Sequence, residues 1–132
     1  MSYVDSVLLC ISCAEDSIEA ETSGLELDTY PLVGQINAWL AEREFRPLVD
    51  ITDHMGGTKH SQMCVFGAAF NYFAPRDEFG AMVISLPWEY PGEVVLLINP
   101  EEGATKIVRP KSGAGKYSLY EGFYVLGDIA RR

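Results

Sequence analysis

Both histidines of the chain lie in one short stretch that also holds an aspartate and a lysine. The stretch DHMGGTKHS contains Asp53, His54, Lys59 and His60. Such side chains can bind a metal ion or act as an acid–base pair, because histidine titrates near neutral pH and is a common zinc ligand. Their spacing matches no recurrent ligand motif, and Gly56-Gly57 between two strand-like runs is typical of a hairpin turn. We therefore interpret the stretch first as an exposed hairpin tip, and as a candidate binding site.

Two further stretches have spacings that partly match known redox, zinc-binding or phosphate-binding motifs. Cys10-Ile-Ser-Cys13 has the spacing of a redox or zinc motif, but it lies at the end of an expected strand, where residues three apart point to opposite faces. The stretch Gly113–Lys116 lacks the earlier glycine and the following Ser or Thr of a phosphate-binding loop. We therefore predict no catalytic residue, no metal ligand and no cofactor, and expect CISC to be chemically quiet.

The net charge of −9 is unevenly distributed along the 132 residues. Residues 1–102 carry 17 acids against four bases, whereas residues 103–132 carry two acids against six bases. Such an acidic body disfavours nucleic acid as the main partner and favours a basic protein. The acids are densest in an expected exposed loop over residues 14–28, where the candidate binding residues are Glu15, Asp16, Glu19 and Glu21.

Hydrophobic periodicity predicts the elements that position these residues. Strands are expected over 3–12, 46–52, 62–73 and 93–100, with a further strand within 103–110. A helix should follow Asp28 or Thr29 as its N-terminal cap, with Pro31 in its first turn and an apolar face at residues 32, 33, 36, 39 and 40. A second helix should bury a stripe formed by Phe79, Met82, Val83 and Leu86.

The order strand, helix, strand, strand, helix, strand predicts an α+β fold of the ferredoxin-like type. This is a split β-α-β sandwich, with an antiparallel sheet that carries two helices on one face. We expect a single domain over 1–132, with a C-terminal strand extension over 103–132. A small parallel sheet fits the alternation less well, because the turn at Gly56-Gly57 is too short for a parallel crossover.

Aromatic residues supply the remaining binding candidates. Trp88 and Tyr90 follow the second expected helix, and alternation would place Phe66, Phe70 and Tyr72 on one face of their strand. If aromatic side chains line the sheet face without helices, a C-terminal segment, a partner or a second copy of the chain should cover it. The open face is therefore the route by which a homodimer would form.

Function is predicted from these features together. We expect a small acidic non-catalytic module that binds a basic protein, as an inhibitor, an immunity-type protein or an adaptor. The alternative is a small metal-dependent enzyme or ligand-binding protein that uses the hairpin of Asp53, His54, Lys59 and His60. The first residues have an acid where a secretory signal carries positive charge, no apolar run is long enough for a membrane span, and the cysteine number is odd. A cytoplasmic location is therefore expected.

Overall fold

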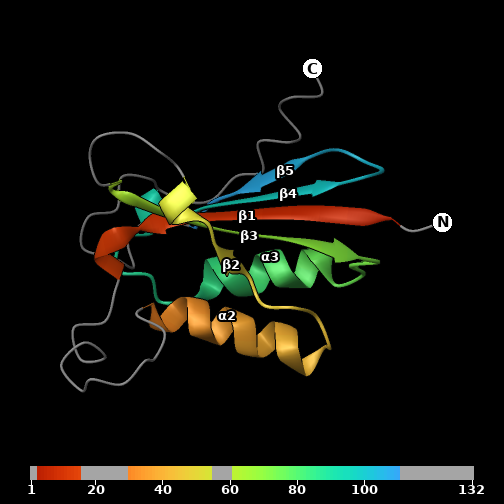
Figure 1. Cartoon of the computed structure of the whole chain (residues 1–132), viewed down its shortest axis with the longest axis horizontal. Helices are drawn as coiled ribbons and strands as arrows, with labels where there is room; N and C mark the ends of the chain where they lie inside the picture. Colours follow the sequence, from red (N-terminus) through yellow and green to blue (C-terminus); the bar gives the residue numbers. More distant parts are fainter. Residues whose placement is uncertain (1–2, 16–29, 55–60, 111–132) are drawn as a thin grey trace.

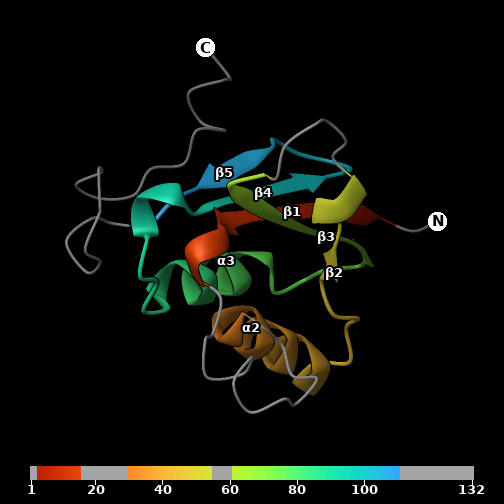
Figure 2. The same cartoon turned by 60° about the vertical axis from the view of Figure 1, so that its left-hand side comes forward.

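The structure is a computed structural model that describes residues 3–15, 30–54 and 61–110. These described residues form an α+β fold with a five-stranded antiparallel sheet and two helices. The strands are β1 (Val4–Ser12), β2 (Val49–Asp50), β3 (Met63–Asn71), β4 (Val95–Pro100) and β5 (Lys106–Val108), and the sheet order is β2-β3-β1-β4-β5. Helices α2 (Pro31–Glu42) and α3 (Arg76–Ser85) lie on the same side of this sheet (Figures 1 and 2). Short 3-10 turns occupy η1 (Cys13–Glu15), η2 (Thr52–His54) and η3 (Pro91–Glu93).

The central strand β1 pairs with β3 on one side and with β4 on the other. Val4 to Ser12 face Asn71 to Met63 of β3, and Asp5 to Cys10 face Pro100 to Val95 of β4. Strand β5 adds to the outer edge of β4, as predicted for residues 103–110. The short strand β2 pairs with β3 at Val49 and Asp50, and the Ile51 N–H continues the pairing with a 2.9 Å hydrogen bond to the Val65 carbonyl.

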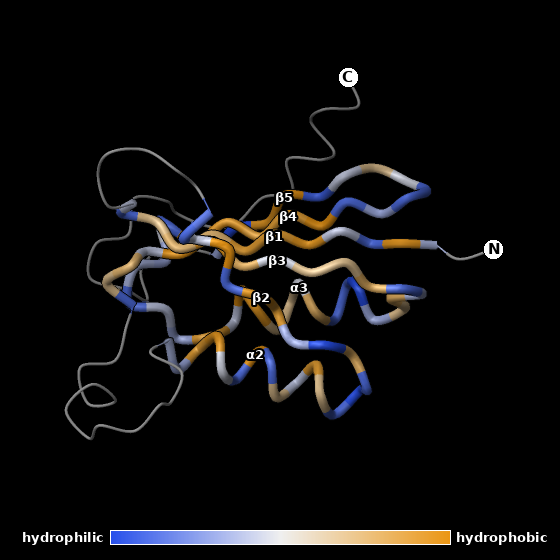
Figure 3. Tube along the Cα trace, viewed as in Figure 1, coloured by the Kyte–Doolittle hydropathy of each residue, from blue (hydrophilic) through white to orange (hydrophobic). Residues whose placement is uncertain are grey.

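The core lies between the sheet and the two helices, because alternate residues of each strand point to the helix side. The apolar character of the central strands is visible along the trace in Figure 3. From the strands, the buried residues include Val7, Leu9, Ile11, Phe66, Phe70, Leu96 and Ile98, and from the helices Val33, Ile36, Leu40, Phe79 and Val83. The predicted helical stripes are therefore confirmed, with Met82 and Leu86 packed partly buried at the edge of the core.

One local prediction is wrong. The N-cap of α2 is Tyr30, which makes no side-chain capping hydrogen bond, so neither Asp28 nor Thr29 has the expected role. Pro31 does occupy the first turn, where its missing N–H costs nothing.

Within the described residues, aromatic side chains do not line the open sheet face. Phe66 and Phe70 point toward the helices, and Tyr72 lies beyond the end of β3, where the strand alternation no longer applies. The open face instead carries aliphatic residues, of which Leu8, Val49 and Met63 are 38%, 58% and 39% exposed. Within the described ranges, no helix is long and apolar enough to cross a membrane.

Candidate binding pocket

A hollow of about 300 Å³ opens at the end of the sheet where β1 begins and where β3 and β4 end. Three chain segments that are far apart in the sequence line it. They contribute Tyr3 and Asp5 from the start of β1, Tyr72, Phe73, Ala74 and Arg76 from the connection between β3 and α3, and Glu101 and Glu102 from the turn after β4.

The strand pairing brings these segments together. Asp5 lies opposite Phe70 of β3 and Pro100 of β4, so residues just beyond those positions converge around the start of β1. Two backbone bonds extend the pairing: the Tyr72 N–H donates to the Tyr3 carbonyl at 2.9 Å, and the Glu101 N–H donates to the Val4 carbonyl at 2.8 Å. The position of the pocket is therefore fixed by the register of the sheet.

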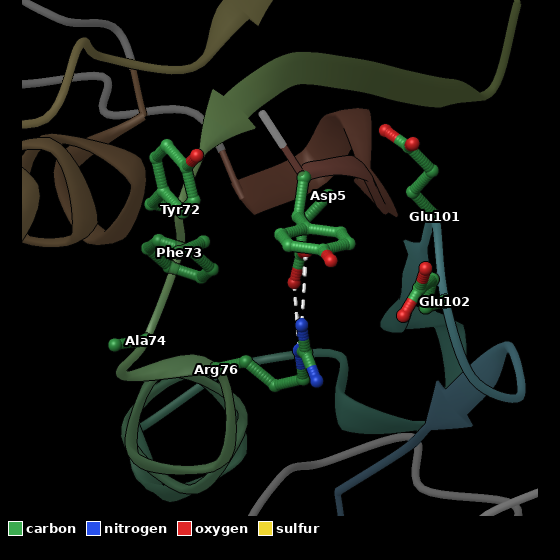
Figure 4. A pocket seen from close by; sticks show the side chains of 8 residues that line it. Asp5, Tyr72, Phe73, Ala74, Arg76, Glu101 and Glu102 are labelled. Atoms are coloured by element: carbon green, nitrogen blue, oxygen red, sulfur yellow. Dashed lines mark hydrogen bonds and ion pairs between the residues drawn. The ribbon is translucent and has the colours of Figure 1, made fainter. Parts of the chain in front are cut away.

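A buried ion pair forms the floor. Asp5 is 1% exposed and accepts two hydrogen bonds from Arg76, from Nε to Oδ2 at 2.7 Å and from an Nη to Oδ1 at 3.0 Å. This bidentate geometry is the strong form of an arginine–carboxylate contact. The hydrogen bonds to Asp5 raise the pKa of Arg76, and the Arg76 side chain remains one-third exposed. Figure 4 shows the pair between the two walls of the hollow.

Tyrosines form one part of the rim. Tyr3 and Tyr72 are 39% and 55% exposed, and their rings meet edge to face with centroids 6.1 Å apart. Tyr72 has a φ of 53°, which few non-glycine residues adopt. This left-handed conformation ends β3, while Phe73 next to it turns into the core and is 2% exposed.

Two exposed glutamates form the opposite wall, across from Tyr72 and Phe73 (Figure 4). The Glu101 side chain is held by the backbone of β1, because its Oε1 accepts a hydrogen bond from the Val4 N–H at 3.1 Å. Lys106 forms an ion pair with a different acid: its Nζ contacts Asp77 Oδ1 at 2.7 Å, and this contact lowers the pKa of Asp77. Among the lining residues, Asp5 and Arg76 offset each other, so the glutamates leave the pocket negative.

This arrangement suits a positively charged ligand. Tyrosine faces attract cations through the ring quadrupole, and carboxylates accept charge-assisted hydrogen bonds from ammonium or guanidinium groups. The lining includes no histidine, cysteine, serine or lysine, so its carboxylates and tyrosines are the side chains there that could act as an acid, a base or a nucleophile. In the described part of the chain, no group of three His, Cys, Asp or Glu residues is placed to hold a metal ion.

The predicted acidic loop is described only at its start. Glu15 is the last residue of η1 and is partly buried, and its carboxylate accepts hydrogen bonds from the Tyr90 N–H at 2.7 Å and the Glu89 N–H at 3.2 Å. Burial raises its pKa despite these two bonds. Glu15 therefore contacts the segment before η3, instead of lying in an exposed loop. Asp16, Glu19 and Glu21 lie outside the described residues.

The other predicted site residues that the structure describes do not line the pocket. Asp53 and His54 are exposed in η2, while Lys59 and His60 lie outside the described residues, so the metal-dependent alternative stays a prediction. Trp88 is 2% exposed and donates from its indole N–H to the Val83 carbonyl at 2.8 Å, which makes it a core residue and not a surface contact. Tyr90 is partly buried, with its backbone bonded to Glu15.

Comparisons of this chain with protein-family models, with curated proteins and with solved structures found no match.

Proposed function

We propose that this chain is a small acidic non-catalytic interaction module that binds a basic partner, in the manner of an inhibitor, an immunity-type protein or an adaptor. The observation that carries the proposal is the pocket in which Tyr3 and Tyr72 are placed with two exposed glutamates, Glu101 and Glu102. An aromatic rim with exposed carboxylates favours the binding of cations.

The size of the pocket suits one side chain of a partner. A volume of about 300 Å³ lies at the small end of the range for ligand pockets, which is enough for one lysine or arginine side chain. The aliphatic part of such a side chain would pack on the tyrosine rings, and its charged end would meet the carboxylates. A basic anchor of this kind is a common centre of a protein interface.

The charge of the whole chain supports the same partner. A net charge of −9 attracts a basic protein over distances of about a Debye length and speeds encounter more than it deepens affinity. The pocket would then supply the short-range specificity that a diffuse negative surface lacks.

Two finer assignments form part of the proposal. The fold is of the ferredoxin-like type, which is supported by the two helices on one side of the sheet and by β1 lying between β3 and β4 in an antiparallel order. The location is the cytoplasm, which is supported by three cysteines, an odd number that does not suit a secreted disulfide framework. A homodimer through the open sheet face stays a prediction.

Titration of the isotopically labelled chain with short peptides tests the proposal. The peptides would carry lysines or arginines spaced by glycine, and a peptide with glutamates at the same positions would be the control. We expect the amide signals of Tyr3, Tyr72, Glu101 and Glu102 to shift with the basic peptides and to stay still with the acidic one. Shifts confined to Asp53 and His54, or spread evenly over all acidic residues, would refute the pocket as the binding site.

A further inference from the structure

Two of the three cysteines lie next to each other at the end of the sheet opposite the pocket. Cys13 in η1 and Cys64 in β3 have their sulfur atoms 2.6 Å apart. Cys13 is partly exposed, while Cys64 is 4% exposed. This contact joins the segment after β1 to the start of β3. It therefore involves different cysteines from the Cys10–Cys13 pair that the CISC motif suggests.

The backbone holds this contact in place. Ile11 lies opposite Cys64 in the β1–β3 pairing, and the Cys13 N–H continues that pairing with a 3.0 Å hydrogen bond to the Gln62 carbonyl. Cys13 therefore follows Ile11 on the helix side, diagonally across from Cys64. Cys10, at an alternate position of β1, is on the other face, and burial raises its pKa.

A third group completes the site. The Tyr30 hydroxyl lies 3.0 Å from the Cys64 sulfur, and it can donate a hydrogen bond to that sulfur when the sulfur carries a negative charge. The Cys13 sulfur also lies 3.5 Å from the Ser61 carbonyl. Cys13 is therefore the partly exposed thiol, and Cys64 is the buried thiol beside a hydroxyl donor. The hydrogen bonds between β1 and β3 hold both in place.

We propose that Cys13 and Cys64 form a reversible disulfide by exchange with a small disulfide of the glutathione class. The Cys13 thiolate attacks one sulfur of the small disulfide, the S–S bond breaks, and one small thiolate leaves. The Cys64 thiolate then attacks the Cys13 sulfur of this mixed disulfide and releases the second small thiolate. The two cysteines lose two electrons, the small disulfide gains them, and the two protons pass to the departing thiolates.

Such a bond would close a ring of about fifty residues and restrict the unfolded chain. It would also fasten η1 to the sheet, and η1 carries Glu15, whose carboxylate holds the backbone of Glu89 and Tyr90. Oxidation of the two cysteines would therefore hold η1, the sheet and the segment of Glu89 and Tyr90 together more firmly than their reduction. We expect oxidation to raise the melting temperature by roughly 10 °C.

The full chain, equilibrated without oxygen in glutathione buffers of different ratios and then quenched with a maleimide, tests this proposal. We expect intact mass to show three labelled thiols in reducing buffer and one in oxidising buffer. Trypsin leaves Cys10 and Cys13 in one peptide, because no lysine or arginine lies between them, so variants must separate the pairings. Cys10→Ser should keep the disulfide, whereas Cys13→Ser and Cys64→Ala should each lose it.

Several outcomes would overturn the proposal. Three labelled thiols in wild-type protein at every glutathione ratio would do so, as would loss of the disulfide in Cys10→Ser. Retention of an intramolecular disulfide in Cys13→Ser would assign the bond to Cys10 and Cys64 instead. The wild-type label count and the Cys10→Ser and Cys13→Ser variants decide the question even if Cys64→Ala does not fold.

Discussion

At the scale of single residues, the Asp5–Arg76 pair links the stability of the fold to the shape of the pocket. Asp5 lies on the helix side of β1, among Val7, Leu9 and other core residues, and Arg76 compensates its charge. Removal of one partner from a buried pair leaves an uncompensated charge, whereas replacement of both by apolar residues is often tolerated.

Arg76→Leu should therefore destabilise the chain by about 3 kcal/mol, because Asp5 loses both of its arginine hydrogen bonds. The double variant Asp5→Leu with Arg76→Leu should recover most of that loss. Chemical denaturation of the wild type, both single variants and the double variant gives the coupling energy. Additive effects of the two substitutions would show that the pair is not coupled.

Glu15 has a pKa above the usual value for glutamate, so its effect on stability should depend on pH. A carboxyl group that binds its proton more tightly in the folded chain stabilises the fold fully below its unfolded pKa of about 4.3. That contribution is lost as the pH rises through the higher, folded-state pKa. The Gln variant retains an oxygen acceptor for the Tyr90 N–H but does not titrate.

We therefore expect the stability of Glu15→Gln, relative to wild type, to increase as the pH rises from about 4 to about 7. Thermal unfolding at several pH values measures this difference, and Glu78→Gln, at an exposed acid of α3, serves as the control for removal of a charge. A relative stability that decreases with pH would mean that hydrogen bonding to the carboxylate outweighs its burial.

At the scale of elements, the sequence predicts what periodicity encodes. The two-residue alternation and the 3.6-residue stripes predict the strands and both helices, and the Gly56-Gly57 pair in the sequence indicates an antiparallel neighbour for β2. The sequence does not show that Trp88 is buried, because it lies between elements, where no periodicity indicates which way a side chain points. Tyr72 departs from the predicted face because the strand alternation does not extend past Asn71, the last residue of β3.

The pocket and the thiol pair could not be predicted for a different reason. Each joins residues that are far apart in the sequence and are brought together by the register of the sheet. One signal was present: Asp5 is an acid within an apolar strand, and Arg76 is one of only four bases in residues 1–102. A buried acid requires a nearby base, so that pair could have been found from the sequence.

Helix α3 gives a direct test of the core assignment. Val83 is fully buried among the residues that join α3 to the sheet, so Val83→Asp should destabilise the chain by about 3 kcal/mol or more. Ala81→Asp places the same charge on an exposed position of the same helix and should cost much less. Equal denaturation midpoints for the two variants would show that α3 does not pack as described.

At the scale of the whole molecule, the two ends of the sheet have different properties. One end carries the pocket with its tyrosines and glutamates, and the other carries the thiol pair, Glu15 and η3. The acidic charge of the chain acts at long range on any basic partner, and only a local site can distinguish one basic group from another. The central claim is that this local site is the pocket.

The most direct test of that claim is the affinity for the lysine peptide of three chains: the wild type, a Glu101→Gln and Glu102→Gln variant, and a Glu89→Gln and Glu93→Gln variant. Both variants remove two exposed carboxylates, but Glu89 lies just before η3 and Glu93 is its last residue, at the opposite end of β4 from the pocket. We expect the pocket variant to weaken binding by about tenfold and the control variant by less than about twofold at physiological salt. Equal losses in the two variants would show that the peptide responds only to total charge, and would contradict the pocket as the site of recognition.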